Sequence, residues 1–179
     1  MRIIAGKYKG HPVKFPNSKL VRPTTDRNKE SMFSTLNNYI DFEDLLVCDI
    51  YAGSGSLGLE ALSRGAKEVH FVEKNFKVSK TLKENIAKLN ANDYCRVILT
   101  SAIKFCSTKS ERKYDLIFAD PPFFKDDIHE VVKNIFENEL LTDNGILLVE
   151  RSIQTKDNDI KSFGKEPIKR LGDSLIYIF

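Results

Sequence analysis

Residues 49–58 read Asp-Ile-Tyr-Ala-Gly-Ser-Gly-Ser-Leu-Gly, and this stretch decides the fold. The apolar run at residues 46–50 is typical of a buried strand, and a helical pattern through Leu59 and Leu62 follows the glycines. A strand, a Gly-x-Gly-x-x-Gly turn and a helix, in this order, let a backbone approach a nucleotide-like ligand closely. The stretch therefore predicts an α/β domain with a ligand site where this strand ends.

Short β-rich runs alternate with helical patterns along the rest of the chain. Apolar faces at helical spacing lie between the strand-like runs, which are expected at residues 68–73, 96–99, 114–119 and 145–150. This repetition predicts a mostly parallel sheet with helices on both faces. Gly172-Asp173 is the signal for a two-residue hairpin near the end of the sequence, so one strand there should be antiparallel.

Basic residues are concentrated before this pattern begins. Residues 1–30 hold eight basic and two acidic side chains, a formal charge of +6, whereas the whole chain of 179 residues carries only +3. We expect a basic extension at residues 1–45, with a small hairpin and a helix, ahead of a Rossmann-like domain at residues 46–179. A basic arm on a nearly neutral body is typical of proteins that bind polyanions.

The composition favours a cytoplasmic protein with one domain. Hydrophobic residues make up 41% of the chain and charged residues 30%, and no apolar run approaches the roughly 18 residues that a membrane helix needs. The cysteines at 48, 95 and 106 are too few and too scattered for a disulfide framework or a zinc site. The histidines have no metal-ligand spacing, so no metal is expected.

The glycine turn and the strand after it point to a ligand with a ribose. Glu73 lies 20 residues beyond Gly53 at the end of the next strand, where its carboxylate can bind a ribose diol. This pattern also fits a dinucleotide, but Asp49 at the strand tip suits an ammonium group better than a pyrophosphate. S-adenosylmethionine carries such an ammonium. We expect Gly55→Val to abolish cofactor binding by filling the space that the ligand needs.

Residues 120–123 read Asp-Pro-Pro-Phe and follow the run at 114–119. The nitrogen of an aromatic amine is a poor nucleophile because its lone pair is delocalised into the ring. The Asp120 carboxylate and the Pro121 carbonyl can each accept one N–H and turn that lone pair toward an electrophile. Two prolines stiffen the turn, and Phe123 can stack on a base. With the glycine turn, this motif favours methyl transfer from S-adenosylmethionine to an exocyclic nitrogen.

These motifs resemble those of class I amino methyltransferases, and four further runs resemble the bacterial RsmD family. The runs are residues 2–6 (Arg-Ile-Ile-Ala-Gly), 22–27 (Arg-Pro-Thr-Thr-Asp-Arg), 30–33 (Glu-Ser-Met-Phe) and 52–66. The resemblance covers nearly the whole chain. It implies methylation of N2 of guanine 966 in 16S ribosomal RNA, and a seven-stranded sheet with an antiparallel last strand. It also implies a small-subunit ribosomal particle as the setting of the substrate.

The expected site residues fall into three groups. The catalytic turn is Asp120, Pro121, Pro122 and Phe123. The residues expected to bind S-adenosylmethionine are Asp49, Tyr51, Ala52, Gly53, Ser54, Gly55, Gly58, Glu73, Lys74, Ser101 and Ala102. The residues expected to bind RNA, from charge or from the resemblance, are Arg2, Lys7, Lys9, Arg22, Thr24, Thr25 and Arg27.

Four other functions compete with this reading. A DNA adenine-N6 methyltransferase could use the same acidic turn, but the chain has no obvious target-recognition domain. A protein-glutamine methyltransferase usually has Asn at the position of Asp120. A nicotinamide-dependent oxidoreductase fits the glycine turn but leaves Asp-Pro-Pro-Phe unexplained, and a non-catalytic RNA-binding module leaves the cofactor motifs unexplained.

Overall fold

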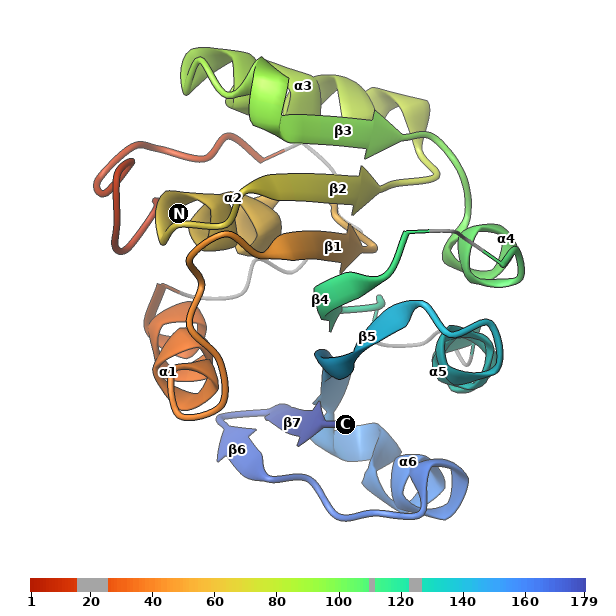
Figure 1. Cartoon of the computed structure of the whole chain (residues 1–179). Coiled ribbons are helices and arrows are strands. Elements are labelled where there is room, and N and C mark those ends of the chain that lie inside the picture. The colour runs from red at the N-terminus through yellow and green to blue at the C-terminus, as the bar shows by residue number, and fades with distance from the viewer. Residues whose placement is uncertain (16–25, 110–111, 123–126) are drawn as a thin grey trace.

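The computed structural model describes residues 1–15, 26–109, 112–122 and 127–179. Seven strands form one sheet in the order β3-β2-β1-β4-β5-β7-β6, with β7 antiparallel to both of its neighbours (Figure 1). The strands are β1 Leu46–Ile50, β2 Glu68–Val72, β3 Cys95–Ile98, β4 Tyr114–Ala119, β5 Leu141–Ser152, β6 Lys169–Leu171 and β7 Ser174–Ile178. The mostly parallel sheet and its antiparallel last strand confirm the predicted fold class.

Helices cover both faces of the sheet. They are α1 Asp26–Leu36, α2 Ser56–Ser63, α3 Phe76–Lys88, α4 Ala102–Cys106, α5 Asp127–Glu137 and α6 Lys156–Phe163, with short 3-10 turns η1 Asn92–Tyr94 and η2 Ile153–Thr155. Apolar residues of α1, α2 and α3 share one buried cluster with one face of the sheet, and those of α4 and α5 share a second cluster with the other face. The sheet therefore lies between two helical layers.

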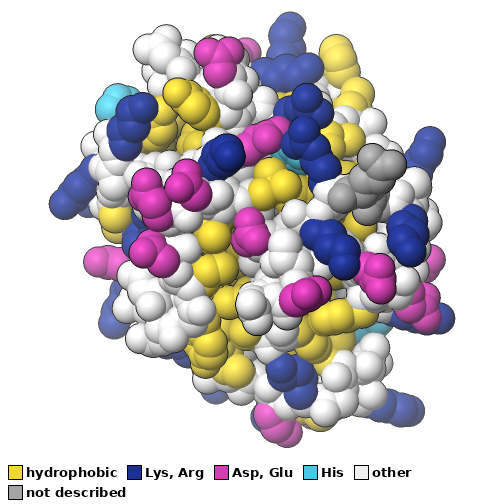
Figure 2. All heavy atoms as spheres, in the orientation of Figure 1, with side chains coloured by type: hydrophobic (Ala, Val, Ile, Leu, Met, Phe, Trp, Pro, Cys, Tyr) yellow, Lys and Arg dark blue, Asp and Glu magenta, His cyan; other side chains and the backbone are white. Residues whose placement is uncertain are grey.

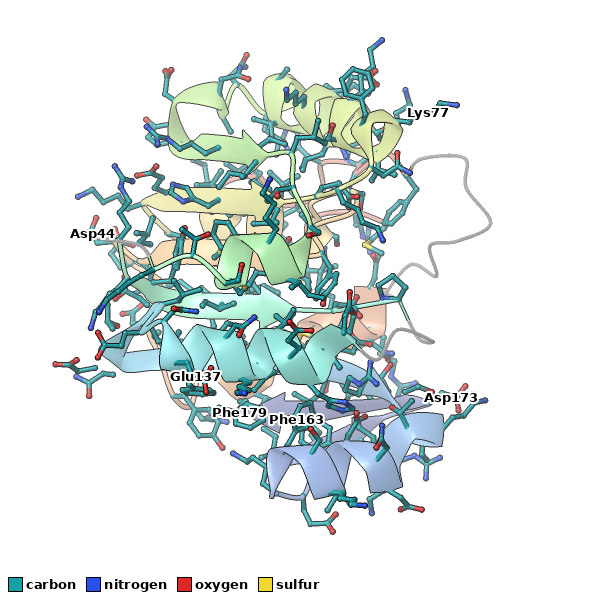
Figure 3. The ribbon with its side chains drawn as sticks, turned by 90° about the vertical axis from the view of Figure 1, so that its right-hand side faces the viewer. Asp44, Lys77, Glu137, Phe163, Asp173 and Phe179 are labelled. Atoms are coloured by element: carbon teal, nitrogen blue, oxygen red, sulfur yellow. The ribbon has the colours of Figure 1, made fainter. Side chains whose placement is uncertain are left out.

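The parallel register brings the predicted site residues to one edge. Ile50 pairs with Val72 on one side and with Ala119 on the other, so Tyr51, Glu73 and Asp120 follow at the same level. We call this the carboxyl edge, and the opposite one, where β1 to β5 begin, the amino edge. In Figure 3, Lys77 and Asp173 lie on the side of the carboxyl edge and Asp44 and Glu137 on the side of the amino edge.

The described N-terminal residues share the core of the sheet domain. Ile3 and Val13 are buried in the same cluster as Phe33 of α1 and Phe118 of β4. The two aromatic rings lie 5.5 Å apart, centroid to centroid. Residues 1–15 contain only an isolated bridge between Arg2 and Pro12 rather than a regular hairpin, and they lie against α2.

A buried ionic cluster attaches this segment to the sheet domain. The fully buried Glu60 carboxylate of α2 accepts hydrogen bonds from the backbone N–H groups of Ile4 and Ala5, at 2.7 and 3.0 Å. Its oxygens also lie 3.1 Å from Lys29 Nζ and 2.9 Å from Arg64 Nε. Lys29 comes from α1, so one carboxylate connects the first residues, α1 and α2.

Candidate active site at the carboxyl edge

The turn between β1 and α2 is built from left-handed backbone conformations. Tyr51, Gly53 and Gly55 have φ values of 68°, 55° and 83°. The Ala52 N–H donates to the Val72 carbonyl at 3.0 Å, and the Gly55 N–H donates to the Ala52 carbonyl at 2.7 Å. The turn is therefore fixed to the end of β2. Of these three residues only Tyr51 is not a glycine, so its positive φ is a strained conformation. Strained residues of this kind cluster at functional sites.

The three glycines have different neighbours. Among the described residues, a Cβ at Gly53 would meet only the Tyr51 carbonyl oxygen, at 3.8 Å, so these residues leave the space beside Gly53 open. A Cβ at Gly55 would lie 2.4 Å from Leu82 Cδ1, and one at Gly58 would lie 2.4 Å from Phe71 Cε1. The expected cause of a Gly55→Val defect was therefore wrong, because the added side chain enters the core between the turn and α3 instead of ligand space.

The Asp49 carboxyl lies beneath the glycine turn. Its side chain is buried, and Oδ2 accepts a hydrogen bond from the Gly58 N–H of α2 at 2.9 Å. Burial raises the pKa of Asp49 to about 8, and the nearby charge of Glu73 acts in the same direction, although the Gly58 N–H opposes both. The Asp49 carboxyl therefore accepts from a backbone N–H at the start of α2 that could otherwise donate to a ligand phosphate. Contact between Asp49 and a ligand ammonium stays a prediction.

Glu73 joins the end of β2 to the glycine turn. Its half-buried carboxylate accepts from the Gly53 N–H at 3.1 Å and from the Asn75 N–H at 2.7 Å, one bond on each oxygen. A carboxylate oxygen has a second lone pair, so both oxygens can still accept from the two hydroxyls of a ribose. Lys74, the next residue, is exposed. The arrangement fits the predicted role of Glu73, which stays a prediction.

The acidic turn begins beside the glycine turn. Asp120 follows Ala119 at the end of β4, and the register places it next to Tyr51 of the neighbouring chain segment. Asp120 is half-buried, Pro121 is buried and Pro122 is exposed. Phe123, the expected stacking residue, lies outside the described residues. The two motifs that the sequence separates by about 60 residues thus meet at the carboxyl edge.

The segment after β3 forms the far side of the site. Ser101 is exposed and caps α4, with its Oγ accepting from the Lys104 N–H at 3.2 Å, whereas Ala102 is buried. Leu99, which sequence reasoning missed, is 53% exposed and follows the Ile98 carbonyl that accepts from the Glu73 N–H at 3.2 Å. An exposed leucine beside Glu73 offers an apolar surface to a planar ring. Nothing in its local sequence distinguishes Leu99 from a strand residue.

Asp127 is a second contact that the sequence does not reveal. The Tyr51 hydroxyl donates to Asp127 Oδ1 of α5 at 3.0 Å. The positive φ of Tyr51 interrupts the alternation of β1 and directs its ring to the α5 face of the sheet, where it packs with the second apolar cluster. The strained tyrosine therefore connects the glycine turn to the start of α5, across 76 residues of sequence.

A buried ionic network supports the end of β5. Arg151 Nε donates to both carboxylate oxygens of Asp159, at 3.1 and 3.0 Å. The Thr155 hydroxyl donates to Asp159 at 2.6 Å, and His129 Nε2 lies 2.8 Å from the same carboxylate. These contacts hold β5, α5 and α6 together, and β5 is the neighbour of β4, which ends at the acidic turn. None of these residues carries a sequence motif.

The predicted RNA-binding residues do not lie together. Arg2 and Arg27 are exposed, and Arg2 Nε lies 3.6 Å from Asp26. Lys7 instead lies at the amino edge, where its N–H donates to the carbonyl of Ser63 at the end of α2. In Figure 1 this part of the N-terminal segment (red) extends on the side where the strands begin, away from the arrowheads.

The remaining members of that set divide in the same way. Lys9 follows Lys7 in the exposed turn at the amino edge. Arg22, Thr24 and Thr25 fall outside the described residues. A contact between RNA and these two lysines would therefore be separate from contacts made at the carboxyl edge, and all of them stay predictions.

The residues present fit S-adenosylmethionine by their chemistry. The open space beside Gly53, the acceptors of Glu73 and the exposed apolar side chain of Leu99 suit a ribose and an adenine. Among the described residues, no three His, Cys, Asp or Glu side chains form a cluster that could hold a metal ion. No helix in the described part of the chain is long and apolar enough to cross a membrane.

Known proteins resemble this chain over most of its length. Residues 1–179 match the family described as Conserved hypothetical protein 95. The Ribosomal RNA small subunit methyltransferase D of Haemophilus influenzae is 39% identical over 152 residues, which cover 84% of this chain and 78% of that protein. Its namesake in Escherichia coli K12 is 36% identical over 154 residues, which cover 86% and 76%.

Solved structures agree with this relationship. The structure "Putative methyltransferase yhhF from Escherichia coli" has a TM-score of 0.83 and 31% identity, and covers 99% of this chain and 96% of that one. Precorrin-6y C5,15-methyltransferase from Geobacter metallireducens shares the fold alone, with a TM-score of 0.69 and 16% identity over 92% of each chain. The fold is thus the Rossmann-like methyltransferase fold, and the chain belongs to the Conserved hypothetical protein 95 family, the RsmD family that its motifs indicated.

Proposed function

We propose that this protein transfers a methyl group from S-adenosylmethionine to the exocyclic N2 of a guanine in 16S ribosomal RNA, at position 966. The names of its relatives support an activity on small-subunit ribosomal RNA. The proposed substrate is ribosomal RNA within a small-subunit particle, which places the protein in the cytoplasm. The guanine-N2 target rests on the resemblance and on the acidic turn.

One observation favours a methyl donor over a dinucleotide. Asp49 already accepts from the Gly58 N–H at the start of α2, the position where a dinucleotide fold presents amides to a pyrophosphate. A second acid, Glu73, lies close enough to raise the pKa of Asp49. The Asp49 carboxyl competes with a pyrophosphate for this amide but can accept from a ligand ammonium, whereas Glu73 suits the ribose of either cofactor and does not discriminate between them.

The mechanism assigns positioning to this chain's own residues. Asp120 would accept one N–H of the guanine amine and the Pro121 carbonyl would accept the other, which turns the nitrogen lone pair toward the donor. The bound cofactor supplies an already activated methyl group. The carboxylate of Asp120 would also favour the positive charge that develops on the nitrogen as its bond to the methyl carbon forms and the donor's sulfur–methyl bond breaks. S-adenosylhomocysteine would then leave, and the nitrogen would lose a proton.

Two measurements test this function. We expect S-adenosylhomocysteine to bind and NAD not to bind in equilibrium titrations, since the reverse order would indicate an oxidoreductase. We expect Asp120→Asn to lower methyl transfer to ribosomal RNA by at least about 10-fold while the affinity for S-adenosylhomocysteine changes little. An Asp120→Asn protein with full turnover would remove Asp120 from the mechanism.

A further inference from the structure

Helix α3 carries a row of exposed lysines that begins at the carboxyl edge. Lys77, Lys80, Lys83 and Lys88 are all exposed, whereas Val78, Leu82 and Ile86 form the buried side of the helix. A spacing of three residues separates the first three lysines along the axis by about 4.5 Å each. Figure 2 shows basic side chains at the top of this face, over α3 and β3. We call these four lysines the α3 ridge.

The charge of the ridge is little reduced by acids. Glu84 is the only acidic residue of α3, and it is paired with Lys14 at 2.8 Å. Lys14 reaches the helix because its backbone N–H donates to Asn85 Oδ1 at 3.0 Å. Lys80 and Lys88 also act on the Glu84 carboxylate, so this one acid faces Lys14 and the ridge lysines together, and the ridge keeps an excess of positive charge.

Two of the four ridge lysines help the helix, because Lys80 and Lys88 each lie four residues from Glu84 and Lys88 is in the last turn, but Lys77 and Lys83 are not placed to stabilise it. Like charges three residues apart repel, which applies to Lys77 with Lys80 and to Lys80 with Lys83. Lys77 also lies in the first turn, where the helix dipole disfavours a cation. In Figure 3 its side chain points away from the body of the protein. A function outside the helix explains this arrangement better than folding does.

An exposed aromatic side chain marks the end of the ridge nearest the site. Phe76 is 69% exposed and begins α3, three residues after Glu73. It lies on the same line of the helix surface as Lys80 and Lys83, because positions four and seven residues on share a face. A phenyl ring beside a row of cations is the combination that binds single-stranded nucleic acid, with stacking for a base and charge for the phosphates.

We propose that the α3 ridge binds the phosphates of the RNA substrate and that Phe76 stacks on an unpaired base next to the target nucleotide. This inference rests on the proposed function, because it takes RNA to be the substrate. The α3 ridge would be a second RNA-binding surface in addition to the basic N-terminal residues. Lys14, which contacts Glu84 and Asn85 of α3, connects the two surfaces. The RNA would pass along α3 and enter the site past Glu73.

The ridge is tested by replacing Lys77, Lys80 and Lys83 together with Gln, which has a similar helix propensity. The probe is small-subunit ribosomal RNA from cells that lack the enzyme, and its affinity is measured over a series of salt concentrations. Each lost phosphate contact should reduce the log–log salt slope by about 0.7 to 0.9, or about 5-fold in affinity at 0.1 M salt, and three contacts by about 100-fold. Affinity for S-adenosylhomocysteine and the Tm should not change.

The matched control removes the same charge from another surface, by replacing Lys109, Lys133 and Lys161 with Gln. All three are exposed, and the last two belong to α5 and α6 on the opposite face of the sheet. Phe76→Ala should lower RNA affinity by about 5- to 150-fold and leave the salt slope unchanged, because stacking releases no counterions.

Binding and methyl transfer are measured separately, so the two ideas can fail independently. If the unaltered protein transfers no methyl group to this RNA, the proposed function is refuted. If the ridge variant and the control variant have equal RNA affinity and equal salt slopes, the ridge proposal is refuted, whatever the activity. If the ridge variant loses binding to phosphatidylserine vesicles but keeps its RNA affinity, the ridge binds anionic lipid instead of RNA, and the proposal is also refuted.

Discussion

Replacing Glu60 with Ala should destabilise this protein more than any other single loss of charge described above. The carboxylate accepts two backbone N–H groups, at Ile4 and Ala5, and pairs with Lys29 and Arg64. Its removal would leave the buried Lys29 ammonium with two neutral hydrogen-bond acceptors, the Arg2 carbonyl at 2.7 Å and Ser56 Oγ at 3.3 Å, and with the weaker influence of the Asp26 charge.

The size of the effect follows from the burial of the pair. Both Lys29 and Glu60 side chains are fully buried, and breaking such a pair from one side costs about 3 to 5 kcal/mol. For a chain of this size the Tm should fall by about 2 to 4 °C per kcal/mol, or about 6 to 20 °C. Lys29→Met should cost less, because Glu60 keeps Arg64 and both backbone donors.

The pH dependence of the variant provides a second check. Burial already lowers the pKa of Lys29, although Glu60 opposes this shift. Without Glu60 the folded-state pKa falls further below the unfolded value, so the folded variant binds fewer protons than the unfolded chain. The stability defect should then shrink as the pH rises toward that of free lysine.

Thermal and chemical unfolding of three variants would measure these effects. Glu137→Ala is the control, because its pair with Lys133 is exposed and is worth at most about 1 kcal/mol. A folded Glu60→Ala protein whose Tm lies within about 3 °C of the control would refute the reasoning. So would a larger loss in Lys29→Met than in Glu60→Ala.

Three further predictions concern the site. Asp49 keeps its proton up to a pKa of about 8 when folded but only to about 3.8 when unfolded, so its contribution to stability is present at low pH and is lost as pH rises. The free energy of unfolding of Asp49→Asn should therefore rise relative to that of the unaltered protein between pH 4 and 8, by at most about 1.4 kcal/mol per pH unit. Denaturant titrations at several pH values would measure this difference, and a difference that does not change with pH would contradict the raised pKa of Asp49. Gly55→Val should lower the Tm, because its Cβ would lie 2.4 Å from Leu82, and an unchanged Tm would show that the core can yield. Gly53→Ala should weaken S-adenosylhomocysteine binding with a smaller loss of stability, since the space beside Gly53 is open, and calorimetric titration would detect the difference.

The sequence predicted the elements whose patterns are local and apolar. The first four parallel strands and the Gly172-Asp173 hairpin lie where the runs of apolar residues and the turn residues indicate, and the fifth strand contains the predicted run at 145–150. Helix α4 has only five residues and α6 is mostly polar, so neither has a periodic apolar face. Strand β5 begins earlier than predicted, because Thr142 to Gly145 look like a turn but form an irregularity opposite Tyr114 and Leu116.

The candidate site also contains residues that the local sequence marks and contacts that it does not. Asp49, Glu73 and Asp120 could be found because each occupies a strand end that the sequence marks. The pair of Tyr51 with Asp127 and the position of Lys7 at the amino edge could not be found, because both depend on how distant segments pack. A count of charges along the chain singled out the basic residues of the N-terminal segment. It did not indicate that the exposed lysines of α3 form a second basic surface beside the site.

Mapping the modified base tests the central claim most directly. Small-subunit particles from cells that lack the enzyme would be incubated with labelled S-adenosylmethionine and the purified protein, and the RNA digested and analysed by mass spectrometry. We expect one methyl group on N2 of guanine 966, and we expect it to be absent when the Asp120→Asn variant replaces the unaltered protein. Label on adenine, on DNA or on a protein glutamine, or no transfer at all, would contradict it.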